Sequence, residues 1–160
     1  MARIRGSAGT TRGFLQSVNK WTKETEQRST EAFQNGALDF YDELSAATPV
    51  LTGNLRNSLI ASVNGAGAPT VTGAGLTSGD STYRSGASQS IAAIMSAKLG
   101  DRISFVYQAT YARRLNYGFT GTDSLGRFYN QAGRFWIERV GARYRTIMRA
   151  AASRLRLRTK

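Results

Sequence analysis

Carboxylates are the side chains of this sequence that come closest to a catalytic pattern. Six of the ten Asp and Glu residues fall in one segment, at Glu24, Glu26, Glu31, Asp39, Asp42 and Glu43. Paired carboxylates act as general acid and base, or bind a metal ion, when they meet in a pocket. Here they accompany a helical apolar pattern, which predicts a solvated acidic face on a long helix.

The other groups that catalysis normally needs are missing from the sequence. There is no histidine to act as a general base near neutral pH, and there is no cysteine for thiolate or disulfide chemistry. A Gly-rich run, with Gly65, Gly67, Gly73 and Gly75, lacks the Gly-Lys-Ser/Thr ending of a phosphate-binding loop. We therefore expect no enzyme activity, no metal site and no cofactor.

The net charge of +12, from 22 basic and 10 acidic residues, is large for 160 residues. Such a field favours polyanionic partners, either nucleic acid or an acidic protein surface, although it also aids solubility. The basic C-terminal segment lies near four aromatic residues that could stack on bases: Phe128, Tyr129, Phe135 and Trp136. The alternative is that these aromatics belong to the core and that the arginines pair with acidic helices of neighbouring copies.

Length and composition predict a single α+β domain over residues 14–157, with a flexible basic arm at 1–13 and a basic tail at 158–160. Residues 64–90 are almost wholly Gly, Ala, Ser and Thr, which predicts a flexible insertion. Because no apolar run approaches about 18 residues, we expect a soluble protein with no membrane partner and no signal peptide.

Hydrophobic periodicity predicts a long helix from about Ser17 to Ala47, in which Gly36 marks either a kink or a close contact. Pro49 and Gly53 predict a turn after this helix, followed by a short helical turn capped by Thr52 or Asn54. Strands are expected at 59–63 and 102–108, with Ile103, Phe105 and Tyr107 on one face, and another at 91–99.

Toward the C-terminus the sequence predicts a short helix over 111–117 that Gly118 ends, then a polar contact loop over 118–133. A basic amphipathic helix should begin near Arg134 and run to the basic tail. The predicted fold is thus a long N-terminal helix, a small antiparallel sheet with a Gly/Ser-rich insertion, and a basic C-terminal helix.

Two segments carry a family resemblance. Residues 48–58 read Thr-Pro-Val-Leu-Thr-Gly-Asn-Leu-Arg-Asn-Ser, and residues 111–118 read Tyr-Ala-Arg-Arg-Leu-Asn-Tyr-Gly. They resemble the tail-completion or neck proteins of tailed double-stranded DNA phages, the minor tail-component family of long-tailed phages, which carry Thr-Pro-Val-Asp-Thr-Gly-x-Leu-Arg-x-Ser and then Tyr-Ala-x-x-x-x-Tyr/Phe-Gly. The matching residues are Thr48, Pro49, Val50, Thr52, Gly53, Leu55, Arg56, Ser58, Tyr111, Ala112, Tyr117 and Gly118.

The likeness covers about residues 20–63 and 103–150, with three departures. Leu51 stands where the family has Asp, so a side-chain cap at the turn must come from Thr52 or Asn54. Gly133-Arg134-Phe135-Trp136 replaces the family's Pro-x-Phe-Leu entry to the last helix, and the 64–90 stretch is longer than the signature needs.

The resemblance implies a virion protein, assembled in the host cytoplasm, that forms a ring where the head meets the tail and surrounds the genome DNA. Six copies are expected, with twelve as the alternative, and the partners would be connector, tail-tube or terminator proteins. Tail terminator, head-side stopper and non-specific DNA-binding protein are the alternative roles. Leu55, Leu59, Tyr111, Leu115 and Tyr117 should pack the turn on the sheet, and the candidate subunit or DNA contacts are Arg56, Arg113, Arg114, Arg139, Arg143 and Arg149.

Overall fold

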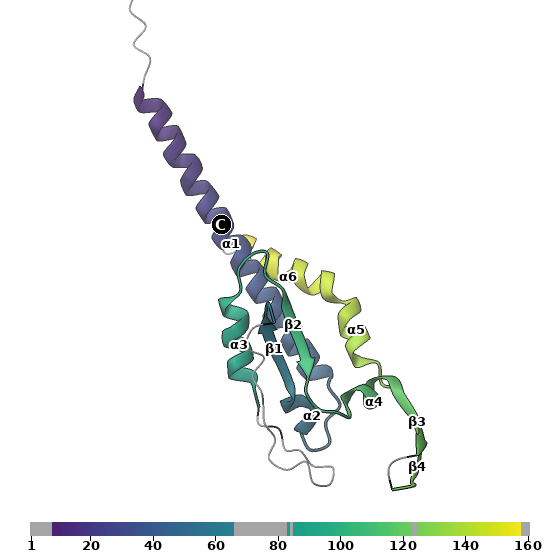
Figure 1. Ribbon diagram of the computed structural model, residues 1–160. Helices are drawn as coiled ribbons and strands as arrows, with labels where there is room; N and C mark the ends of the chain where they lie inside the picture. Colours follow the sequence, from purple (N-terminus) through teal and green to yellow (C-terminus); the bar gives the residue numbers. More distant parts are fainter. Residues whose placement is uncertain (1–7, 66–82, 84, 123–124, 158–160) are drawn as a thin grey trace, which may run out of the picture.

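A computed structural model of the chain describes residues 8–65, 83, 85–122 and 125–157, and shows a mixed α+β architecture (Figure 1). This is the predicted fold class. In chain order the elements are α1 (Ala8–Ala47), α2 (Asn54–Asn57), β1 (Leu59–Val63), α3 (Ala87–Ser96), β2 (Ile103–Tyr107), α4 (Ala112–Tyr117), β3 (Gly118–Thr122), β4 (Phe128–Ala132), α5 (Trp136–Ala142) and α6 (Tyr144–Leu157).

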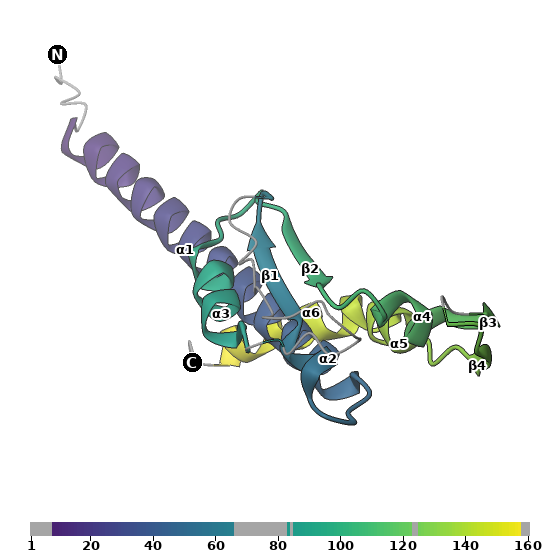
Figure 2. The ribbon, with the colours of Figure 1, turned by 60° about the horizontal axis from the view of Figure 1, so that its bottom comes forward.

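Helix α1 is the longest element, with 40 residues and a length of about 60 Å at 1.5 Å per residue. It begins at Ala8, earlier than predicted, so residues 8–13 of the predicted arm are helical. Its C-terminal half packs on the rest of the chain, while its N-terminal half extends away from the body (Figures 1 and 2). The predicted arm is left with residues 1–7, which lie outside the described residues.

The two predicted strands at 59–63 and 102–108 pair antiparallel, as expected, with Leu59 opposite Tyr107 and Val63 opposite Ile103. Strand β1 is buried along most of its length, because α3 packs on it and residues of α1 contact it in the core. The main core joins residues of α1, β1, α3 and α5, namely Ala37, Tyr41, Leu44, Leu59, Ala61, Ile94 and Val140, and Ile103, Phe105 and Tyr107 pack against it from β2.

The predicted strand at 91–99 is wrong, because most of this segment belongs to helix α3. The buried residues of α3, Ser90 and Ile94, are four positions apart, which is a helical spacing. Helix α3 takes the place of a third strand: Ser90 Oγ accepts a hydrogen bond from the backbone N–H of Ala61 at 3.0 Å. A polar side chain of α3 therefore satisfies part of the open edge of β1.

The predicted polar loop over 118–133 is also wrong, because β3 and β4 form an antiparallel hairpin there. The hairpin lies at the opposite end of the molecule from the start of α1 (Figures 1 and 2). Close approach of the backbone explains a glycine at its base: a Cβ on Gly133 would lie 2.6 Å from the carbonyl carbon of Tyr117. That glycine lets β4 leave the hairpin directly beside the end of α4.

The C-terminal basic helix is divided in two, because α5 ends at Ala142 and α6 begins at Tyr144. Helix α6 packs along α1, and the two helices come close at Gly36. Of the two alternatives that the sequence left for this glycine, a kink or a close contact, the structure shows the close contact. A Cβ at Gly36 would overlap the sulfur of Met148. The predicted tail at 158–160 lies outside the described residues.

Candidate assembly interface

The turn over 48–58, which is the first of the two segments that carry the resemblance, is held by hydroxyl groups. The Thr48 hydroxyl donates to the Leu44 carbonyl at 2.7 Å and lies 2.7 Å from the Tyr107 hydroxyl. The indole N–H of Trp136 donates to the same Tyr107 oxygen at 3.2 Å. Burial raises the pKa of Tyr107, so its hydroxyl stays protonated. These contacts tie the end of α1 to β2 and α5.

Backbone geometry then reverses the chain. Gly53 has a φ of 82°, in the left-handed region that favours glycine, and it precedes the single turn of α2. The predicted side-chain cap is only weakly present, because Thr52 Oγ1 accepts from the Asn54 N–H at 3.4 Å while Gly53 occupies the cap position itself. Ser58, fully buried, closes the turn by donating from Oγ to the Leu55 carbonyl at 2.7 Å.

The structure brings together the two segments that carry the resemblance. The Asn54 amide donates to the Tyr111 hydroxyl at 3.2 Å, and Asn54 Oδ1 accepts from the Tyr83 N–H at 2.6 Å. Leu55 and Ala112 are both buried in a second core cluster that also contains Trp136. The segment 48–58 is therefore joined to 111–118 by both hydrogen bonds and apolar packing.

Tyr117 departs from the predicted packing, since its side chain is 57% exposed. Ala112 and Asn116 occupy the buried side of α4 at i and i+4, so the next residue points about 100° away. Tyr117 packs edge-on against Phe135, with ring centroids 6.2 Å apart. Leu55 and Leu59 are buried as expected, and Tyr111 and Leu115 are partly buried against the second cluster.

A polar group that the sequence did not indicate anchors α4 to α5. Asn116 is fully buried, and its amide donates to both carboxylate oxygens of Glu138, at 3.0 and 2.8 Å. Its Oδ1 accepts from the Ile137 N–H at 3.3 Å. The hydrogen bonds that Glu138 accepts from Asn116 and Tyr117 hold the pKa of its carboxyl group below the ordinary value of 4.5. An asparagine two residues after the basic pair Arg113-Arg114 gives no sign in the sequence that it is buried.

An apolar cavity of about 380 Å³ opens beside the turn. Val50 and Leu51 line it and are 53% and 98% exposed. Tyr111 and Leu115 line its other side, together with Arg134. The cavity holds no cluster of acids or nucleophiles, so its lining suits contact with an apolar side chain better than chemistry.

The extension of α1, defined as residues 8–28, carries the largest uncovered apolar side chains of the helix. Phe14 is 66% exposed and Trp21 is 67% exposed, and Leu15 and Val18 lie beside them in the sequence. Phe14, Val18 and Trp21 are spaced i, i+4 and i+7, which places them on one side of the helix. This apolar stripe is a candidate contact surface.

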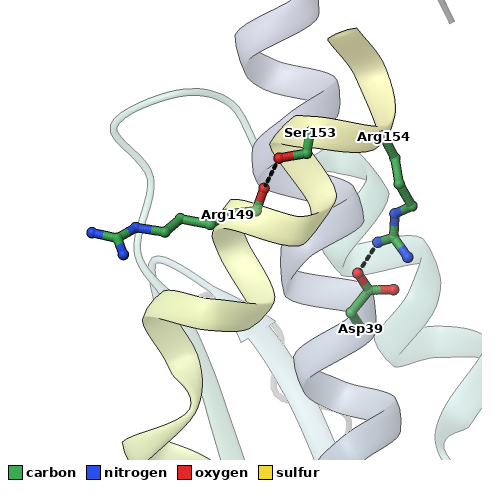
Figure 3. Close-up of polar contacts among 4 residues, drawn as sticks. All are labelled: Asp39, Arg149, Ser153 and Arg154. Atoms are coloured by element: carbon green, nitrogen blue, oxygen red, sulfur yellow. Dashed lines mark hydrogen bonds and ion pairs between the residues drawn. The ribbon is translucent and has the colours of Figure 1, made fainter. Parts of the chain in front are cut away.

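The arginines predicted as contacts divide into two groups. One of them pairs inside the chain, since Arg143 Nη1 lies 3.1 Å from Glu43 Oε2. Arg154 of α6, which was not among the predicted contacts, pairs with Asp39 (Figure 3). The acidic and basic helices thus contact each other within one copy, which leaves fewer carboxylates for neighbouring copies than the sequence suggested.

The remaining candidates lie at the surface in different settings. Arg56 Nε donates to the Ser45 carbonyl at 3.0 Å, and the Arg114 guanidinium lies 4.4 Å from the centre of the Phe119 ring. Arg113, Arg139 and Arg149 are exposed, and the Arg149 guanidinium points away from α1 (Figure 3). The aromatics proposed for base stacking also separate, because Trp136 is in the core while Phe128, Tyr129 and Phe135 are exposed.

Within the described ranges, no three His, Cys, Asp or Glu side chains gather as metal ligands. Among the helices in the same ranges, none is both long and apolar enough to cross a membrane. No protein-family model matches the chain, and neither a curated protein nor a solved structure matches it.

Proposed function

We propose that this chain is a structural virion protein that assembles with copies of itself into a ring at the head-tail junction of a tailed phage. The observation that carries the assembly part of the proposal is the extension of α1, where Phe14 and Trp21 are each about two-thirds exposed. Large apolar side chains clustered on a projecting element are typical of protein interfaces.

The hairpin supports the same proposal. An isolated two-stranded hairpin is marginal in water, and all five residues of β4 are exposed. Leu125 and Phe128 are 74% and 70% exposed at its tip. Since the extension and the hairpin lie at opposite ends of the molecule (Figure 1), contact between unlike surfaces of successive copies would close into a ring or continue as a filament.

The phage neck setting comes from the resemblance of residues 48–58 and 111–118. In its favour, these matched residues form one continuous structural unit, with Gly53 in the left-handed conformation and Asn54 bonded to Tyr111. Tail completion is the role we propose. Tail terminator and head-side stopper are rival positions in the same assembly, and a free DNA-binding protein is the rival class.

Native mass measurement of the full-length protein, alone and mixed with connector or tail particles, tests the proposal. A ring of six or twelve copies, or incorporation into one of these particles, is the expected result. Trp21→Ser should reduce assembly, whereas Asn19→Ser, an exposed polar change on the same helix, should leave it intact. A chain that stays monomeric and joins neither particle would refute the proposed function.

A further inference from the structure

The outer face of α6 presents arginines that α1 does not use. At about 100° per residue, Arg145 and Arg149 lie within about 40° of each other, and about 120–160° from buried Ile147 and Ala151. Arg154 lies on the flank that faces α1, where it pairs with Asp39 (Figure 3). The helix therefore has a basic side committed to the fold and a second basic side directed to solvent.

We propose that Arg145 and Arg149 form a binding face for the phosphate backbone of duplex DNA. Their positions are one helical turn apart, about 6 Å along the axis, which is shorter than the Debye length of about 10 Å at 0.1 M salt. Their fields therefore add. No Asp or Glu occurs between residues 139 and 157, so nothing on the same segment offsets them.

The occupant must be a polyanion of a different kind from this chain. Each copy has a net charge of +12, so further copies add positive charge faster than they neutralise it. Asp39 and Glu43, two of the acidic residues nearest to α6, already pair with Arg154 and Arg143. Nucleic acid supplies the regular row of anions that an arginine row fits.

Side-chain chemistry favours duplex backbone over single strands. Every basic residue from 134 to 158 is arginine, whose planar fork binds phosphate through two N–H groups. Small exposed residues, namely Ala142, Thr146, Ala150 and Ser153, lie beside the pair, so a wide backbone can approach. Single-strand binding relies on stacked aromatics, and Tyr144, the only aromatic residue of α6, lies edge-on against Phe40 of α1.

This inference deepens the proposed function, in which the ring surrounds the genome. The test measures binding of the full-length protein to a short duplex of arbitrary sequence from about 0.05 to 0.3 M salt. Arg145→Gln with Arg149→Gln should weaken binding roughly tenfold at 0.1 M salt, and should reduce the slope of log K against log salt by about 2. Arg145→Lys with Arg149→Lys should retain most of the slope, because the charges remain.

Lys20→Gln with Lys23→Gln is the matched control, since it removes the same charge from the exposed α1 extension. It should change the slope by much less than the arginine pair. Equal changes in both variants would overturn the proposed face, as would tighter binding to a single strand or to poly-glutamate than to duplex. Circular dichroism of each variant verifies that it is folded.

The two proposals fail separately. A protein that forms a ring and joins phage particles but shows equal slopes in the two variants keeps its proposed function and loses the arginine face. A monomer that joins no particle, but whose duplex binding depends on Arg145 and Arg149, loses the proposed function and keeps the face.

Discussion

Both carboxylate oxygens of Glu138 accept hydrogen bonds from the side-chain amide of Asn116, which is fully buried between α4 and α5. The contact joins the helix that bears the second matched segment to the helix that follows the hairpin. It also gives the fold a specific dependence on pH.

Because hydrogen bonding lowers the pKa of Glu138 in the folded state, its ionised form stabilises the protein above the ordinary value of 4.5. That contribution is lost as the pH falls through the lowered pKa. Glu138→Gln should melt at a lower temperature at pH 7 and should lose less stability than the parent between pH 5 and 2. Thermal melts across this range measure both effects. Asp101, whose pKa is lowered by bonds from the Lys98 backbone and Asn64, should contribute acid sensitivity in both proteins.

Replacing Gly53 tests the turn. A Cβ there would meet nothing within 4 Å, so any cost of Gly53→Ala arises from its φ of 82° alone. We expect a loss of about 1–2 kcal/mol in the free energy of unfolding, and more for Gly53→Val. Gly141→Ala is the control: it also meets nothing within 4 Å, lies in a helix, and should stabilise by about 0.5–1 kcal/mol. Unchanged melting of Gly53→Val would contradict the conformational argument.

Two other glycines differ in what an added Cβ would meet, which is backbone at Gly133 and a flexible side chain at Gly36. A Cβ on Gly133 would lie 2.7 Å from the Asn116 carbonyl oxygen, and backbone cannot move aside cheaply. Gly133→Ala should therefore cost about 3 kcal/mol or more in denaturant unfolding. At Gly36 the obstacle is the flexible end of Met148, and alanine is favoured in a helix by about 1 kcal/mol. Gly36→Ala should therefore leave the free energy of unfolding nearly unchanged. A larger loss for Gly36→Ala than for Gly133→Ala would contradict these contacts.

The hydroxyl group of Thr48 can be removed with little change of shape. Thr48→Val removes the Thr48 hydroxyl from the Leu44 carbonyl and the Tyr107 hydroxyl, which still contact each other, and Tyr107 also keeps its bond from Trp136. The loss of the Thr48 bonds should cost about 0.5–1.5 kcal/mol. Thr48→Ser retains the hydroxyl and should recover most of this loss. Chemical denaturation of the three proteins gives the comparison. A valine variant as stable as the parent would mean that the hydroxyl contributes nothing at this position.

The elements that could be predicted from sequence are those with a strong local pattern. Long periodicity indicated α1, Pro49 and Gly53 indicated the turn, and the alternation of Ile103, Phe105 and Tyr107 indicated β2 and its inward face. Segment 91–99 is short and apolar, so local pattern did not separate helix from strand; the packing of Ile94 against β1 decides it. The hairpin was missed because its strands contain Gly118 and Gly121 and few β-branched residues.

The candidate surfaces show a similar division. The residues that match the family signature predicted both the turn over 48–58 and its contact with α4, because each signature is a run of neighbouring positions in the sequence. The pairing of Arg154 with Asp39 was not visible, since it joins residues 115 positions apart in the sequence. The rotation of α6 about its own axis decides which of its arginines face α1 and which face solvent. That rotation shows in the contact of Met148 with Gly36, which the sequence does not reveal.

Helix α1 is unbroken between its extension and the half that packs in the core. A flexible linker would allow a copy bound through Phe14 and Trp21 to take any orientation. A continuous helix transmits orientation instead, so the angle at which the extension is bound fixes the orientation of the rest of the protein. In a closed ring of such copies, the diameter of the central opening would follow from the length and direction of this one helix.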